Sequence, residues 1–260
     1  MDQLKKLISI PSYSGRETEA ADFIESLLND QGITPLRKKN NVWAFPNHYR
    51  KDKPNLLVNA HMDTVQPASG WTMDPHQPVE KDERIYGLGA NDDGASLVCL
   101  LDTFLHFSHQ DMPVNIIFSA TAEEETGKEE GIQSIVNDLP DISIAVMGEP
   151  TGMKMAPGER GLLVIDGKVS GTAAHAAREN DDNAILNAME VFNKLQQISF
   201  DRHSPFLGKV QATVSQISAG LQHNVTPSEC RFVLDIRLNE YYTPGEIWKI
   251  LQSELGCELT

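Results

Sequence analysis

Histidine and acidic residues follow directly on three apolar stretches of this sequence. His61 and Asp63 follow the first stretch, Glu124 and Glu125 follow the second, and Glu149 follows the third. Imidazole and carboxylate groups together are suitable ligands for Zn²⁺ or Co²⁺. If the three stretches are parallel neighbours in one sheet, their carboxyl ends bring these side chains to one crevice, where open α/β sheets bind ligands. The sequence therefore predicts a metal site.

The types of the neighbouring residues suggest separate roles within this site. A carboxylate that bridges two ions lets both share one water as nucleophile, and Asp92 is our candidate bridge, with Asp93 as its competitor. Asp63 lies two residues after the histidine, where its carboxylate can hold the second imidazole nitrogen. Because adjacent side chains diverge, Glu125 can bind metal while Glu124 faces the substrate as general base.

The first half of the chain alternates predicted strands and helices. We expect strands at 41–45, 56–60, 114–122 and 144–148, and helices at 16–31, 96–107 and, in short form, near 129–137. Residues 66–94 are rich in Pro, Gly and Asp, so they predict a long functional loop. Strands separated by helices indicate right-handed crossovers and a mostly parallel sheet. The expected class of this half is α/β.

After residue 155 the order of expected strands and helices changes. We expect strands at 161–171, 210–217 and 229–238, and helices at 182–198 and 243–255. The order β-α-β-β-α is that of a ferredoxin-like α+β domain, which closes with one more strand, and only 257–260 remain to begin it. We therefore expect two domains, 1–155 and 156–260, and we expect the chain shown to be incomplete at its C-terminal end.

Composition excludes several classes of partner. The chain has 260 residues and a net charge of −15, which argues against nucleic acid or an anionic membrane surface, since both require basic patches. No run approaches the roughly 18 apolar residues that span a bilayer, and the start lacks a signal-peptide pattern, so we expect a soluble cytoplasmic protein. The three cysteines lack a CxxC spacing, which favours reduced, mostly buried thiols.

Four short strings in this order resemble a known family. They are HMDTV at 61–65, YGLGANDDGA at 86–95, AEEETG at 122–127 and GEPT at 148–151. The family is that of the zinc-dependent deacylases and exopeptidases, which includes acetylornithine deacetylase, succinyl-diaminopimelate desuccinylase, aminoacylase and carboxypeptidase G. The resemblance implies one or two zinc ions, with cobalt as a possible substitute. It implies the following roles: His61 and Glu149 on one ion, Glu125 on the other, Asp92 as bridge, Glu124 as base and Asp63 as support for the imidazole.

The resemblance also implies a lid domain that is inserted in the catalytic domain and forms a homodimer, and the second half of this chain looks like that lid. His175, in GTAAHAAR, matches a histidine that reaches the partner subunit's site to stabilise an oxyanion, although Ala174 replaces the glycine often found before it. Asn224 and Arg237 resemble substrate-binding residues of the lid. Arg160 is a further candidate for a substrate carboxylate, because guanidinium offers a bidentate fork.

These observations lead to hydrolysis of the amide bond of a small N-acyl amino acid, with acetylornithine deacetylase as the first expectation. Succinyl-diaminopimelate desuccinylase and a di- or tripeptidase are the alternatives. The resemblance implies a second metal-binding histidine after the lid, and no residue after Cys257 can play that role. That absence motivates a reading of another class, a non-catalytic metal-binding or dimerisation protein. Retention of Glu124 argues against it, since a structural site does not need a base.

Overall fold

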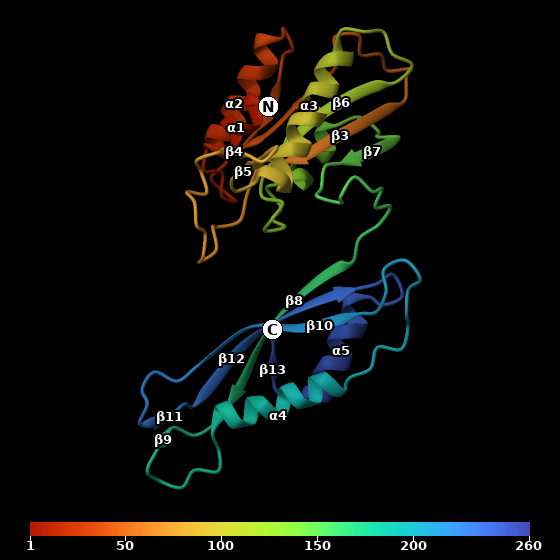
Figure 1. Cartoon of the computed structure of the whole chain (residues 1–260). Helices are drawn as coiled ribbons and strands as arrows, with labels where there is room; N and C mark the ends of the chain where they lie inside the picture. Colours follow the sequence, from red (N-terminus) through yellow and green to blue (C-terminus); the bar gives the residue numbers. More distant parts are fainter. The chain divides into compact units, whose positions relative to one another are not determined.

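Figure 1 shows the computed structural model, which describes residues 1–260 and divides into two units, Met1–Lys154 and Met155–Thr260. In the first unit a five-stranded sheet has the order β1-β2-β6-β3-β7. Its strands are β1 (Leu36–Lys38), β2 (Asn41–Ala44), β3 (Asn55–His61), β6 (Asn115–Thr121) and β7 (Ile144–Met147). Strand β3 lies between β6 and β7 and is parallel to both, so the carboxyl ends of all three strands meet at one edge of the sheet.

The expectation of a mostly parallel sheet holds only for these three strands. Strand β2 runs antiparallel to β6, and β1 runs antiparallel to β2, which makes the sheet mixed. The turn between β1 and β2 is formed by Lys39 and Asn40, and Lys39 has a φ of 53°. Two strands joined by so short a turn can pair only in the antiparallel sense, because a parallel connection needs a dozen or more residues.

Helices α1 (Asp2–Ile8), α2 (Thr18–Asp30) and α3 (Ala95–Ser108) complete the first unit. Both α2 and α3 pack their apolar residues against the same face of the sheet, where the rings of Phe104 and Phe118 stack at 5.8 Å between centroids. Helix α1 was not predicted from the sequence. This helix has only seven residues and buries little more than Leu4 and Ile8, so its apolar pattern is too short to be distinctive.

Two expected segments of the first unit differ in detail. The predicted loop at 66–94 contains a two-stranded sheet, β4 (Val79–Lys81) with β5 (Arg84–Tyr86), and then the irregular turn η1 (Ala90–Gly94). The short helix expected near 129–137 is replaced by two single 3₁₀ turns, η2 (Ile132–Ser134) and η3 (Val136–Asp138). Only Ile135 between those turns is deeply buried, with no exposed surface, and one apolar anchor does not sustain an amphipathic helix.

The second unit has the strand order of a ferredoxin-like domain. Its sheet runs β10-β12-β8-β13 with every pairing antiparallel. The elements are β8 (Gly161–Ser170), α4 (Ala184–Gln197), β10 (Gln211–Ala219), β12 (Glu229–Leu238), α5 (Pro244–Leu255) and β13 (Glu258–Leu259). A separate pair, β9 (Ala174–His175) with β11 (Val225–Thr226), extends beyond the end of the sheet (Figure 1). Strand β13 has two residues and pairs antiparallel with β8.

The sequence explains why α5 begins and ends where it does. Thr243 accepts a hydrogen bond from the backbone N–H of Glu246, and the Glu246 side chain accepts one from the N–H of Thr243, which is a capping box. Pro244 occupies the first turn, where its missing N–H costs nothing. Gly256 follows the last turn with a φ of 66°, a left-handed conformation that glycine adopts without strain.

The three cysteines are all free, as expected, but they differ in burial. Cys230 is buried and Cys257 is half-buried, whereas Cys99 is exposed on α3, so the expected burial does not hold for it. None of the helices combines the length and apolar character that crossing a membrane requires.

Gly167 of β8 gives a prediction about the stability of the second unit. It lies directly opposite Phe232, and a Cβ at this position would come within 2.1 Å of the phenyl ring. Phe232 is buried and cannot move aside easily. We expect Gly167→Ala to lower the free energy of unfolding by about 1–3 kcal/mol through overpacking. In urea unfolding, Gly245→Ala is the matched control, because a Cβ there meets nothing; equal midpoints for the two variants would contradict the packing argument.

Candidate metal centre

His61 ends strand β3 and lies at the centre of the site. Its side chain is buried, and its backbone N–H donates to Oδ2 of Asp93 at 3.3 Å. Nε2 of the imidazole is 3.0 Å from Oδ1 of Asp92 and 4.0 Å from Oε2 of Glu124. Nδ1 is held by the backbone oxygen of Asp63 at 2.9 Å. One ring nitrogen is therefore anchored to the chain, and the other faces carboxylates.

Asp63 was expected to support the imidazole, and the structure gives its carboxylate a wider role. The carboxylate lies 3.4 Å from Nδ1 of His61, farther than the carbonyl oxygen of the same residue. Its oxygens accept hydrogen bonds from the backbone N–H groups of Glu124 and Glu125 at 3.0 and 3.1 Å, and from the hydroxyl of Ser14 at 2.7 Å. Asp63 thus joins the end of β3 to the glutamate loop that follows β6.

The pKa values of these two residues are consistent with an ion pair. Burial acts to raise the pKa of Asp63, but the hydrogen bonds that it receives from His61, Ser14 and Glu124 outweigh burial and lower that pKa below its ordinary value. Burial acts to lower the pKa of His61, and the hydrogen bond and charge of Asp63, with other carboxylates, raise it to about 10. Excess negative charge surrounds the imidazole.

Asp92 and Asp93 are adjacent in η1 but face different surroundings. The side chain of Asp92 is 51% exposed, whereas Asp93 is buried. Only Asp92 belongs to a group of side chains that could hold an ion, which supports the choice of Asp92 over Asp93 as the candidate ligand. Oδ1 of Asp93 is buried without a hydrogen-bond partner, and burial is the main cause of the raised pKa of this carboxyl group.

The geometry of the donor atoms fits a zinc-sized ion beside His61. The donor atoms of His61, Asp92 and Glu125 lie within 4.8 Å of one another, and so do those of His61, Glu124 and Glu149. Two atoms that bind one zinc ion at about 2.1 Å in tetrahedral geometry lie roughly 3.4 Å apart. The imidazole lies 3.0 Å from Asp92, close to that separation, whereas its distance of 4.0 Å from Glu124 is wider.

The charges of the site also favour the binding of a divalent cation. Burial, together with the charges of Glu124, Asp93 and Asp92, raises the pKa of Glu149 to about 7, although His61 opposes the shift. Burial is also the largest cause of the raised pKa of Glu125, followed by the charge of Asp92. Carboxylates gathered at this density repel one another, and a divalent cation would relieve that repulsion.

The candidate ligands form two groups that share His61. Glu125 lies with His61 and Asp92, and the resemblance assigned Asp92 as the bridge between the ion of His61 and the ion of Glu125. Glu124, the expected base, shares the second group with Glu149.

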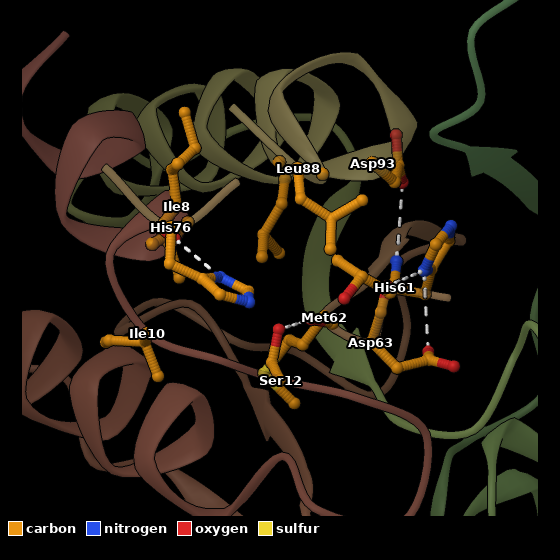
Figure 2. Close-up of a pocket in the computed structure, with 14 residues that line it drawn as sticks. Ile8, Ile10, Ser12, His61, Met62, Asp63, His76, Leu88 and Asp93 are labelled. Carbon is orange, nitrogen blue, oxygen red and sulfur yellow. Dashed lines mark hydrogen bonds and ion pairs between the residues drawn. The ribbon is translucent and has the colours of Figure 1, made fainter. Parts of the chain in front are cut away.

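Figure 2 shows a small pocket behind the imidazole. Its walls include His61, Asp63 and Asp93 on one side and Ile8 and His76 on the other. The volume of about 20 Å³ accommodates a water molecule but no amino-acid derivative. The side chains of Asp92 and Glu124, by contrast, are 51% and 52% exposed.

In the second unit, the residues expected to bind substrate form two separate groups. His175 and Asn224 meet in the β9–β11 pair, where the N–H of Ala176 donates to the backbone oxygen of Asn224 at 2.9 Å. Arg160 and Arg237 lie at the opposite end of β8 and β12, both beside Gln211. Since β8 has ten residues, these ends are roughly 30 Å apart.

Each of the two arginines already has a local partner. Arg237 binds both carboxylate oxygens of Asp235, at 2.8 and 3.0 Å, and Arg160 donates from Nε to the backbone oxygen of Leu207 at 2.7 Å. Both side chains are exposed. Within the second unit the structure therefore does not bring Arg160, Asn224 and Arg237 together around one ligand.

Sequence reasoning missed residues that shape the glutamate loop. Ser14 donates to Asp63, and Oδ1 of Asn41 accepts the N–H of Ala122 at 3.0 Å, next to the glutamates. Neither residue carries a sequence signal of its own, because both act across long separations in the chain.

Comparison with known proteins identifies the family. The model of peptidase family M20/M25/M40 matches residues 57–243, which include every candidate ligand at the carboxyl ends of β3, β6 and β7. The chain belongs to this family. A probable carboxypeptidase from Emericella nidulans is 26% identical over 90% of this chain, and a succinyl-diaminopimelate desuccinylase from Erythrobacter litoralis is 25% identical over 96%.

Family members with solved structures share this fold. An M20 family metallo-carboxypeptidase from Sulfolobus solfataricus matches 99% of this chain and 76% of its own length, with a TM-score of 0.76 at 17% identity. The chain spans 61% of the length of the Emericella carboxypeptidase and 71% of that of the Erythrobacter desuccinylase.

Proposed function

We propose that this chain carries the metal-binding part of a hydrolase that cleaves the amide bond of small N-acyl amino acids or short peptides. The observation that supports it most strongly is the convergence of one imidazole and several carboxylates at the carboxyl ends of three parallel strands. In this proposal His61, Asp92, Glu125 and Glu149 hold one or two zinc ions, and Asp63 positions them.

Zinc in such a site would polarise the amide carbonyl and lower the pKa of water. Glu124 then accepts a proton from the water that attacks the carbonyl carbon, and it delivers that proton to the nitrogen of the leaving amine. Its side chain is 52% exposed, so it can reach a substrate, while its backbone N–H is fixed by Asp63. One water is consumed, and the products are a carboxylic acid and an amine.

His175 is proposed to donate a hydrogen bond to the oxyanion in the active site of a second copy of the chain, in a homodimer formed through the second unit. The N–H of Ala177 donates to Nδ1 of His175 at 3.2 Å, so the neutral imidazole carries its proton on Nε2. The side chain is exposed. A fixed tautomer with an outward N–H suits an oxyanion donor. Arg160, Asn224 and Arg237 are proposed substrate contacts.

The identity of the acyl group that is removed is a more specific part of the proposal. An acetyl group was our first expectation from the sequence, but the relatives described above favour a succinyl group or a C-terminal peptide bond. A succinyl group carries a free carboxylate, and exposed arginines such as Arg160 or Arg237 are suited to bind one. We therefore rank desuccinylase and carboxypeptidase activity above deacetylation.

Hydrolysis by zinc-loaded protein tests the function directly. The substrates to compare are N-acetylornithine, N-succinyl-diaminopimelate, a dipeptide and a tripeptide, with release of the free amine as the readout. The proposal expects zinc-dependent release from at least one of them. If zinc is bound and none is cleaved, the non-catalytic metal-binding or dimerisation role is the better description.

Zinc should also stabilise the fold, because its ligands come from separate segments of the first unit. An ion that binds only the folded state at about 100 times its Kd adds about 2.7 kcal/mol. For a unit of this size the Tm should rise by roughly 5–10 °C. Thermal unfolding followed by circular dichroism measures the shift. Excess EDTA should reverse the shift. A Tm that does not change on addition of zinc would argue against a site that joins these segments.

A further inference from the structure

The loop that carries the glutamates is held through its backbone. Four successive N–H groups after β6 each donate to a buried side-chain oxygen: Ala122 to Asn41, Glu123 to Glu17, and Glu124 and Glu125 to Asp63. The loop turns sharply at Glu123, whose φ is 54°. A non-glycine residue with this backbone conformation persists only where its surroundings hold it.

Glu17 is as fully buried as the other two anchors, Asn41 and Asp63, and has no place in the proposed chemistry. It has no exposed surface. Oε1 accepts the N–H of Glu123 at 3.2 Å and the N–H of Gly15 at 2.6 Å, and Oε2 accepts a hydrogen bond from Nδ2 of Asn40 at 2.9 Å. Both carboxylate oxygens are thus occupied by donors from three separate parts of the chain, and the side chain faces no substrate.

We propose that Glu17 is a positioning residue, whose buried carboxylate holds the loop at Glu123 so that the side chains of Glu124 and Glu125 point into the metal centre. The N–H of Glu123 lies one residue before those that Asp63 holds. Without Glu17, Asn41 and Asp63 still hold the residues on either side, but nothing holds the N–H of Glu123, so the strained turn relaxes and the two carboxylates move apart from His61. The expected effect of Glu17 on zinc binding rests on the proposed function. The expected effect on the loop is independent of it.

Three variants test the proposal. Glu17→Ala removes the acceptor. Glu17→Gln keeps one oxygen that can accept the N–H of Glu123, but its new amide NH₂ faces the NH₂ of Asn40, so two donors meet. Adding Asn40→Asp replaces the second donor with an acceptor and restores that hydrogen bond. Glu19→Gln is the matched control, because Glu19 is exposed in the first turn of α2, the helix that directly follows Glu17.

Two readouts are needed on the full chain. Hydrogen exchange of a peptide covering 121–127 should be faster in Glu17→Ala than in wild type without added metal. Zinc affinity, measured by competition with a chromophoric chelator, should fall by about 10–100-fold, as it does when a supporting partner is removed. Glu17→Gln should show a smaller loss that Asn40→Asp restores, and Glu19→Gln should match wild type.

The outcomes separate this inference from the proposed function. If Glu17→Ala folds by circular dichroism with exchange and zinc affinity equal to the control, the inference is overturned. If Glu17→Ala does not fold, the single variant Glu17→Gln is compared with the double variant Glu17→Gln/Asn40→Asp. Equal hydrogen exchange and equal zinc affinity in these two proteins would overturn the inference. A wild-type chain that binds no zinc removes the proposed function, while hydrogen exchange still decides whether Glu17 holds the loop.

Discussion

Glu124→Gln is expected to reduce kcat by about 10²–10⁴-fold, the usual contribution of a general base, while the bound zinc stays unchanged. The amide has the size of the carboxylate but cannot accept the proton of the attacking water. The backbone N–H of Glu124 remains on Asp63, so the loop keeps its position. The measurement pairs kcat on the best substrate with zinc content per chain.

Two neighbouring glutamates provide the controls for this result. Glu129 is exposed beyond the same loop, and Glu129→Gln should leave both quantities unchanged. Glu125→Gln should lose zinc, because Glu125 groups with His61 and Asp92. Loss of zinc in Glu124→Gln instead would place Glu124 among the ligands and overturn its role as base.

The second large effect is expected for His61→Ala. The imidazole belongs to both groups of candidate ligands, so its loss affects either way of placing an ion. Removing a partner that only supports a ligand costs about 10–100-fold in metal affinity, and removing a direct ligand should cost more. Turnover should disappear together with the zinc.

His106→Ala is the matched control, since His106 is exposed on α3 and away from the acidic residues. It should bind zinc like wild type. Zinc titration by calorimetry compares the two variants. Equal affinity in His61→Ala and His106→Ala would show that the ion binds elsewhere in the chain.

The strands that carry the site could be predicted from the sequence because their signals are local. The apolar stretches that became β3, β6 and β7 are each followed by His61, Glu124 or Glu149, and parallel pairing then brings their ends together. The second unit was predictable for a similar reason. The Thr-Pro-Gly-Glu start of α5 and the amphipathic pattern of α4 are complete within a few residues.

The supports of the site could not be predicted, because they depend on distant segments. Glu17 meets Glu123 across more than a hundred residues, and Asn41 meets Ala122 across eighty. No spacing rule connects such pairs before the sheet is formed. The same applies to Asp63: its two-residue distance from His61 suggested an imidazole support, while its bonds to the glutamate loop appear only in three dimensions.

The most direct test of the metal centre is the zinc content of the chain after chelator treatment, reloading with zinc and dialysis, measured by atomic emission for wild type and His61→Ala in parallel. We expect one or two zinc ions per wild-type chain and none retained by His61→Ala. A wild-type chain that retains no zinc, or an equal content in both proteins, would contradict the proposed metal centre.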